Sequence, residues 1–230
     1  MNALTKLALG LMGQLKPLPS IGISAKTWTL LPPTQSGGKP LMEVLANRQS
    51  QREFSPLDLP EQTLSDLLWA AAGINRVEHG GRTFPSAMNA QEVLLYVATP
   101  VGLYVYDPTR HVLELTVASD VRRVTGNQDF VDTAPLDLVY VADHTRMKLI
   151  PAAQREAFAC VATGAMAQNV YLYCASAGLS TVIRAWFDRQ ALSDAMGLGA
   201  DHQLLFSQTV GAGKGGLANP HPVSGAKDTQ

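Results

Sequence analysis

The sequence Arg48-Gln49-Ser50-Gln51-Arg52-Glu53-Phe54 follows a short apolar segment and is the most informative motif of the chain. If this backbone is extended, alternate side chains share a side, which places Arg48, Ser50 and Arg52 together. Two guanidinium groups and a hydroxyl suit a phosphate, because each guanidinium offers a planar set of N–H donors. The alternative is a solvated helix end, where the helix dipole favours arginine.

The elements around this stretch follow from the spacing of apolar residues. A short helix at 42–46 precedes it, and after Pro60 an apolar helical repeat runs to Gly73, a natural helix stop. Strands are predicted at 93–99, 101–107, 111–117, 136–142, 179–183 and 204–210, and helices at 151–177 and 189–196, with one or two short helices within 120–132. The first three strands form an antiparallel meander, and the fourth is central because it is continuously apolar.

The ends of the chain differ from this middle region. Residues 1–40 are interrupted by several prolines and by Gly37-Gly38, so we predict an extended N-terminal arm. Residues 218–230 form a polar C-terminal tail. Residues 41–217 are therefore predicted to form the domain.

Composition excludes several classes of protein. The chain has 230 residues, 46% of them hydrophobic, which is ample for a buried core. A net charge of -1 with 16% charged residues provides no basic stripe for nucleic acid and no polybasic surface for lipid. No apolar run reaches the length of a membrane span, and the N-terminus only partly resembles a signal peptide. We therefore expect a cytoplasmic protein, with export as the alternative.

Residues 76–91 form a long polar turn that contains Gly80-Gly81. A helix that begins near Ser86 would present free backbone N–H groups, and the amides of Asn89 and Gln91 can both donate and accept hydrogen bonds. These groups suit the polar edge of a heterocycle. The alternative is a capped loop in which Arg82 is solvated.

Conventional catalytic groupings are missing from the sequence. We find no Ser/His/Asp order, metal-ligand spacing or carboxylate pair. Cys160 and Cys174 would lie about 21 Å apart on one helix, too far for a disulfide. Lys214 stands among glycines, but Gly215 replaces the Ser or Thr that a phosphate loop requires. This pattern fits a protein whose bound cofactor carries the chemistry.

The order of motifs resembles the FMN-dependent nitroreductase superfamily. The motifs are Leu45-x-x-Arg48-x-Ser50-x-Arg52-x-Phe54, then Leu64-x-x-Leu67-Leu68-x-Ala70 with Gly73, then Arg82-Thr-x-Pro85-Ser86-Ala87-x-Asn89-x-Gln91. The Gly-Gly-Arg-Thr-x-Pro-Ser-Ala run, with the following Gly-Leu-Tyr-x-Tyr hairpin, is similar to the SagB-type dehydrogenase branch. The resemblance covers roughly residues 41 to 216 and implies an α+β fold, with a mixed, mainly antiparallel sheet flanked by helices. It also implies an intertwined homodimer with FMN at each subunit interface.

The resemblance further implies which residues bind the cofactor. For the FMN phosphate and ribityl chain they are Arg48, Gln49, Ser50 and Arg52, joined near the end of the chain by Gly211 and Lys214. For the isoalloxazine, contributed by the other subunit, they are Pro85, Ser86, Ala87 and Asn89. The backbone near flavin N5 is that of Ile183, Arg184 and Ala185, and Trp186 is expected to stack over the ring or narrow the substrate pocket.

Three functions are compatible with these features. The first is an oxidoreductase that passes hydride from NAD(P)H through flavin N5 to a small organic acceptor such as a nitro compound or quinone, without a catalytic side chain. The second is a flavin-binding or flavin-less interaction module without turnover. The third is a SagB-like dehydrogenase that acts on a peptide or amino-acid-derived substrate.

Overall fold

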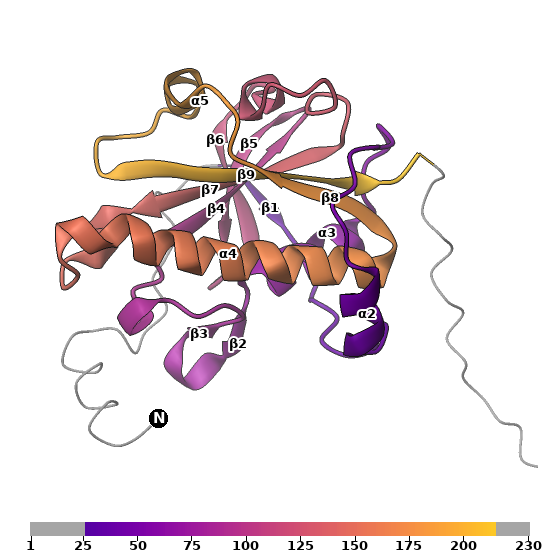
Figure 1. Ribbon diagram of the computed structural model, residues 1–230, viewed down its shortest axis with the longest axis horizontal. Coiled ribbons are helices and arrows are strands. Elements are labelled where there is room, and N and C mark those ends of the chain that lie inside the picture. Colours follow the sequence, from indigo (N-terminus) through magenta and orange to yellow (C-terminus); the bar gives the residue numbers. More distant parts are fainter. Residues whose placement is uncertain (1–25, 215–230) are drawn as a thin grey trace, which may run out of the picture.

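The computed structural model describes residues 26–214, and its main element is a seven-stranded sheet with the strand order β1-β6-β5-β4-β7-β9-β8 (Figure 1). The strands are β1 (Thr27–Thr29), β4 (Val93–Thr99), β5 (Gly102–Asp107), β6 (Val112–Val117), β7 (Leu136–Asp143), β8 (Leu179–Arg184) and β9 (His202–Ala212). All pairings described in this sheet are antiparallel. The α+β class is therefore confirmed, whereas the parallel pair that a mixed sheet requires is not found within residues 26–214.

Strand β7 lies in the sheet between β4 and β9 because both of its faces are apolar. Leu138 and Tyr140 belong to the hydrophobic core on one face, and Val139 and Val141 belong to the core on the other. Side chains alternate between the faces of a strand, so a strand that is covered on both faces reads as a continuous apolar run. The predicted central strand at 136–142 is confirmed.

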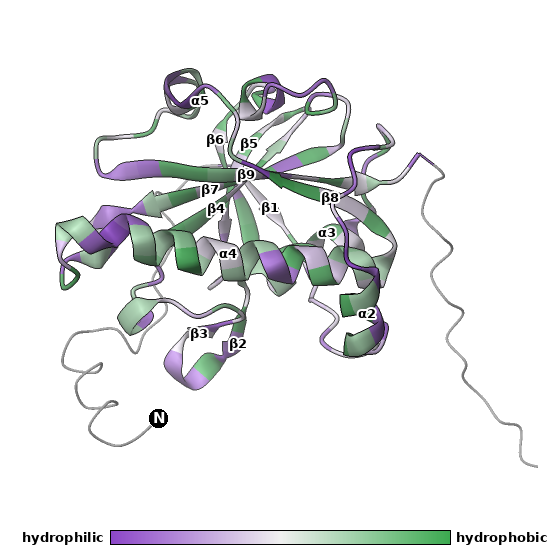
Figure 2. Ribbon diagram, viewed as in Figure 1, coloured by the Kyte–Doolittle hydropathy of each residue, from purple (hydrophilic) through white to green (hydrophobic). Residues whose placement is uncertain are grey.

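The two faces of the sheet are covered by different helices. Helices α3 (Glu61–Ala72) and α4 (Ala152–Ala177) cover one face, and α5 (Arg189–Met196) lies on the other (Figure 1). Helix α2 (Leu41–Asn47) contacts α4. Figure 2 shows the strands mostly in the green of apolar residues, as expected for a sheet between two hydrophobic cores. The predictions of a long helix at 151–177 and a short one at 189–196 are confirmed.

Helix α4 leads directly into β8 through Gly178. This glycine has a φ of 72°, the left-handed conformation that commonly ends a helix. The chain then reverses, and β8 pairs with β9 at the edge of the sheet. The stretch that begins at Arg48 lies against this same edge.

Part of the predicted N-terminal arm is a strand. Trp28 in β1 pairs with Leu113 in β6, and Leu115 N–H donates to the Lys26 carbonyl. β1 therefore extends the sheet on the side opposite β8. Residues 1–25, which include the signal-like segment and the start of the arm, and residues 215–230, which include the C-terminal tail, lie outside the described residues.

The remaining described elements are short. They are the hairpin of β2 (Ile74–Arg76) and β3 (Gly81–Arg82) and the 3-10 turns η1 (Val77–His79), η2 (Ala87–Asn89), η3 (Arg122–Thr125) and η4 (His144–Met147). The helix predicted to begin near Ser86 is wrong, because Met88 and Asn89 have φ values of 53° and 56°, which a right-handed helix cannot continue. The predicted short helix within 120–132 corresponds to η3.

Candidate functional site

The stretch from Arg48 to Phe54 is extended and runs along the β8–β9 edge of the sheet. Helix α2 ends at Asn47, and Arg48 has φ -60° and ψ 122°. Gln51 N–H donates to the Thr181 carbonyl of β8 at 3.0 Å, and Ser55 N–H donates to the Ala212 carbonyl of β9 at 2.8 Å. These two bonds fix the stretch against the final strands, so the extended interpretation of the sequence is confirmed.

Tyr171 on α4 holds one side of this stretch. The Ser50 hydroxyl lies 2.8 Å from the Tyr171 hydroxyl, and the Arg48 guanidinium lies 5.3 Å from the centre of the Tyr171 ring. The same Tyr171 oxygen accepts the Ile183 N–H of β8 at 3.0 Å. Tyr171 was not singled out in the sequence, because a tyrosine on an apolar helix gives no signal of its own.

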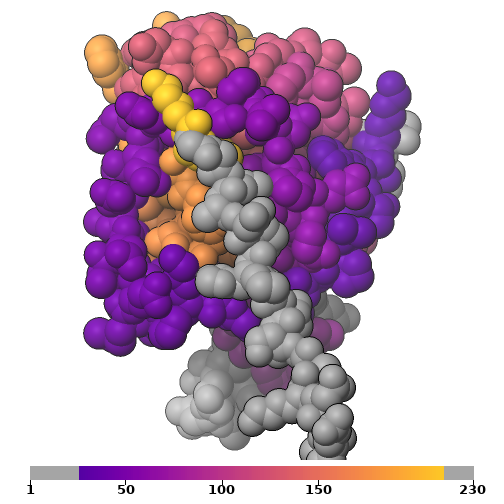
Figure 3. Space-filling view, turned by 90° about the vertical axis from the view of Figure 1, so that its right-hand side faces the viewer, coloured from indigo at the N-terminus to yellow at the C-terminus, as the bar shows by residue number. Residues whose placement is uncertain are grey.

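The other side of the stretch faces a surface hollow of about 380 Å³. The hollow is lined by Gln49, Gln51, Arg52, Glu53, Ser180, Gly213 and Lys214. Figure 3 looks onto this end of the molecule, where purple atoms of the early chain border orange atoms and the yellow end of β9. The predicted alternation thus fails at Arg52, which lines the hollow with Gln49 and Gln51 instead of sharing the Tyr171 contacts of Arg48 and Ser50.

The charges of this hollow favour an anion. Arg52 and Lys214 are cationic, and the carboxylate of Glu53 lies 3.9 Å from the Lys214 ammonium group. All three side chains are exposed, so they are screened by solvent and free to move towards a ligand. Gly211, in contrast, is buried: a Cβ there would lie 2.7 Å from the Pro135 ring, so the structure gives this glycine a packing role.

Residues 85–91, the loop predicted to face the flavin, have a strained backbone and are held by hydrogen bonds within the loop. Met88, Asn89 and Gln91 all have positive φ, which costs energy for residues other than glycine. The Ser86 hydroxyl accepts the Gln91 N–H at 3.0 Å, and the Asn89 side-chain oxygen accepts from the Gln91 amide at 3.2 Å. This conformation must therefore be imposed by the surrounding structure.

Arg82 and Gln91 form the buried support of this loop. Arg82 donates to the Ala72 carbonyl at 2.7 Å and to the Gln91 side chain at 3.2 Å, while Gln91 also donates to the Gly80 carbonyl at 2.8 Å. Burial lowers the pKa of Arg82 to about 10. The alternative of a solvated Arg82 is wrong, and so is the expectation that Gln91 faces a heterocycle, because only 1% of its surface is exposed.

Thr83, two residues before this loop, and the Arg48 stretch contact different faces of α4. Asn169 donates to the Thr83 carbonyl at 3.2 Å, whereas Tyr171 contacts Ser50. Two residues along a helix correspond to a rotation of about 200°. One chain therefore does not bring these two groups of predicted flavin ligands together.

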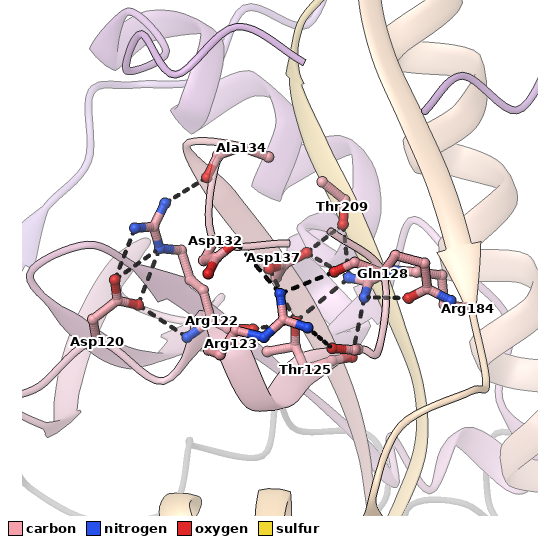
Figure 4. A network of polar contacts seen from close by, with 11 residues as sticks. Asp120, Arg122, Arg123, Thr125, Gln128, Asp132, Ala134, Asp137, Arg184 and Thr209 are labelled. Carbon is pink, nitrogen blue, oxygen red and sulfur yellow. Dashed lines mark hydrogen bonds and ion pairs between the residues drawn. The ribbon is translucent and has the colours of Figure 1, made fainter. Parts of the chain in front are cut away.

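The segment predicted to approach flavin N5 is the end of β8. The Ile183 N–H is already bonded to Tyr171. The Arg184 side chain is buried and bonded to Asp137 (Figure 4). Ala185 and Trp186, in contrast, are exposed. Of these residues, only Ala185 and Trp186 present a substantial surface to solvent, and 70% of Trp186 is exposed.

The described residues give no support for a metal site, a disulfide or a membrane span. Within residues 26–214 no group of three His, Cys, Asp or Glu side chains is placed to hold a metal ion. Cys160 and Cys174 are both free, as the sequence predicted. None of the described helices is long and apolar enough to cross a membrane.

Comparison with known proteins identifies relatives of this chain. A profile described as "Nitroreductase family" matches residues 45–212. A provisionally named nitroreductase of Methanocaldococcus jannaschii is 34% identical over 163 residues, which are 65% of this chain and 81% of that protein. A crystal structure of another provisionally named nitroreductase, from Ralstonia eutropha, is 51% identical with a TM-score of 0.79, over 86% of this chain and 95% of the other.

A more distant structure shares only the fold. It is a nitroreductase, also provisionally named, from Desulfovibrio desulfuricans in complex with FMN, and it is 18% identical with a TM-score of 0.56. The alignment covers 82% of this chain and 95% of that one. The profile match, the sequence identity and the shared architecture lead to one conclusion: this chain belongs to the nitroreductase family.

Proposed function

We propose that this protein is an FMN-dependent oxidoreductase that takes electrons from NAD(P)H and reduces a small organic acceptor. The observation that carries the proposal is the cationic hollow at the β8–β9 edge, where Arg52 and Lys214 lie beside the amides of Gln49 and Gln51. Homologues of the nitroreductase family bind FMN and NAD(P)H. When bound, the flavin would accept hydride from the nicotinamide and deliver it to the acceptor, such as a nitro compound or quinone.

The donors around the hollow fit an FMN phosphate and ribityl chain. A phosphate needs N–H and O–H donors, which guanidinium, ammonium, amide and hydroxyl groups supply. Arg52 and Lys214, which line the hollow, would bind the phosphate. Arg48 and Ser50 would either rotate away from Tyr171 to reach the phosphate or bind it through donors that Tyr171 does not occupy. Gln49 and Ser180 would contact the ribityl hydroxyls. Gly211, which packs against Pro135, would allow the β9 backbone to lie close to the cofactor.

The isoalloxazine would be lined by Pro85, Ser86, Ala87 and Asn89 from a second copy of the chain. These residues lie across α4 from Ser50, so two chains offer a route to assemble what one chain keeps apart. The strained backbone of Asn89 would hold its amide in place, since the Arg82–Gln91 support fixes the loop before the cofactor binds. The protein would thus supply orientation and hydrogen bonds, without an acidic or basic catalytic side chain.

We also propose the intertwined homodimer that this arrangement requires. Helix α4 leaves Phe158 and Val161 on its outer face, with 39% and 69% of their surfaces exposed, and a Cβ added at Gly164 would meet open space. The adjacent α2 exposes Leu41 and Met42 to a similar degree. Clustered exposed apolar side chains often mark an interaction surface, so a second copy would be the natural cover for this face.

Acceptor choice is assigned to the exposed end of β8. The indole of Trp186 would stack on a planar acceptor or narrow its access to the flavin. A dehydrogenase of the SagB type, acting on a peptide or amino-acid-derived substrate, is the second candidate. The Gly80-Gly81-Arg82-Thr83 run supports it, because Gly81 lets Arg76 pack closely while Arg82 supports the 85–91 loop.

Replacement of both arginines tests the cofactor site. The double variant Arg48→Ala/Arg52→Ala should weaken FMN binding by a factor on the order of 100 or more, since each charge-assisted contact contributes about 1.5 to 3 kcal/mol. Titration of the apoprotein with FMN, followed by quenching of flavin fluorescence, measures this loss. The control is Arg110→Ala, which removes an arginine paired with Glu114 away from the hollow. An unchanged FMN affinity in the double variant would place the site elsewhere.

A further inference from the structure

A buried polar cluster lies directly under the end of β8 (Figure 4). The Arg184 guanidinium donates to the Asp137 carboxylate at 2.5 Å and to the Thr209 hydroxyl at 2.7 Å. The Thr209 and Thr125 hydroxyls donate to the same carboxylate. Arg184 is 7% exposed and Asp137 is fully buried, so the ion pair is shielded from solvent.

The same guanidinium also reaches the loop that follows η3. It donates to the Thr125 carbonyl at 3.2 Å and to the Gln128 side chain at 3.3 Å. A Cβ on Gly126 would lie only 1.8 Å from the guanidinium, so the loop backbone closes tightly over it. One side chain thereby joins β7, β8, β9 and this loop.

The loop in turn holds the backbone of Trp186. Asn127 N–H donates to the Trp186 carbonyl at 3.3 Å, and the Ser207 hydroxyl of β9 donates to the Thr125 carbonyl at 2.8 Å. Residues 125–127 are thus bonded both to the sheet and to the segment just after β8. The backbone from which the exposed Trp186 side chain projects is therefore held by this set of contacts.

A buried ion pair is a poor way to gain stability alone. Desolvation of the two charges offsets much of their attraction, and apolar side chains of similar size often stabilise a fold as well. The Arg184 Nε atom is buried without a hydrogen-bond partner, which adds to the cost. What this pair provides is a fixed arrangement of four segments, since a guanidinium donates in several set directions at once.

We propose that Arg184 is a positioning residue, whose contacts with Asp137, Thr209 and Thr125 fix residues 184–186 and thereby hold Trp186 in place for the acceptor. The part that concerns the acceptor rests on the proposed function. The fixing of the segment does not, because it follows from contacts within the chain. Arg184 acts through the backbone and Trp186, and its own side chain lies beneath the surface.

The test compares Arg184→Gln with Arg122→Gln in the full-length, FMN-saturated protein. Arg122 is also a buried arginine, but it bonds Asp120 and the Ala134 carbonyl and is not bonded to β8. Amide hydrogen exchange, read by mass spectrometry, should rise about 10-fold or more in residues 184–188 for Arg184→Gln only. The acceptor KM should rise roughly 10-fold, while the nicotinamide KM and FMN affinity stay within about 3-fold.

Two further variants keep the test decisive. Arg184→Lys should restore part of the acceptor KM, because a cation can still pair with Asp137. If Arg184→Gln does not fold, Thr209→Val removes one hydroxyl from the cluster and should raise exchange in the same segment by a smaller factor.

The outcomes separate the two proposals. Equal amide exchange of residues 184–188 in Arg184→Gln and Arg122→Gln would overturn the positioning role. An equal rise in the KM values for acceptor and nicotinamide would also overturn it. If NAD(P)H does not reduce the FMN of the wild-type protein, the proposed function is wrong, and so is the role of Arg184 in acceptor binding. The exchange comparison would still decide whether Arg184 fixes residues 184–186.

Discussion

At the scale of single residues, Tyr171 shows how the site is assembled. Its hydroxyl lies between the Ser50 side chain and the Ile183 N–H, and its ring lies under the Arg48 guanidinium. One side chain on α4 thus connects the stretch proposed to bind phosphate with the strand proposed to face the flavin.

Glu92 makes folding stability depend on pH. Both of its carboxylate oxygens are buried and lack hydrogen-bond partners in the described part of the chain. Burial raises its pKa above the usual value, and Arg146 opposes this only partly. A carboxyl whose folded pKa is raised favours folding at low pH, and this contribution is lost as the pH rises through that pKa.

We therefore predict that Glu92→Gln makes stability less dependent on pH. As the pH rises from about 4 through the raised pKa, the wild type should lose free energy of unfolding relative to the variant, by about 1.4 kcal/mol for each unit by which folding raises the pKa. Urea denaturation at several pH values measures this. Glu78→Gln is the control, because the Glu78 side chain is 91% exposed. A Glu92→Gln curve parallel to that of the wild type would contradict the prediction.

At the scale of elements, we expect the outer face of α4 to form the interface of the proposed dimer. We predict that Val161→Asp weakens the dimer about 100-fold, because an unpaired charge would be buried at the proposed interface. Light scattering coupled to gel filtration over a range of concentrations measures this. Val101→Asp is a matched control: Val101 is also 69% exposed, but it lies in the turn between β4 and β5. Equal dimer masses for both variants would remove α4 from the interface.

The sequence was sufficient for elements with a strong pattern. The continuous apolar run of β7 and the proline-free repeat of α4 each identify one structure, because burial selects for their period. The strand β1 was missed, since three residues in a proline-rich region carry no period, and only pairing with β6 makes them a strand. Its position depends on contacts distant in the sequence.

The candidate site was predictable only in part. The residue types at 48–52 indicated an anion site, and the structure supplies a cationic hollow there. The direction of each side chain was not predictable: Arg52 departs from the simple alternation, and Gln91 turns inward to Arg82. Both follow from tertiary contacts, and the left-handed conformations of Met88, Asn89 and Gln91 are adopted only because such contacts hold them.

At the scale of the whole molecule, the two groups of residues proposed to bind the flavin lie around α4. The hollow at the β8–β9 edge offers donors for a phosphate, and the 85–91 loop offers a rigid polar surface on the other face of the helix. Two such chains would complete both sites at once. Cofactor binding and dimer formation should therefore be coupled, since each stabilises the other.

Anaerobic stopped-flow mixing of the purified, FMN-saturated protein with NADH or NADPH tests whether the protein is an FMN-dependent oxidoreductase. We predict that the flavin absorbance is bleached on mixing with at least one nicotinamide, and that it returns when a quinone or nitro compound is added. A protein that binds FMN yet shows no bleaching with either nicotinamide would contradict it.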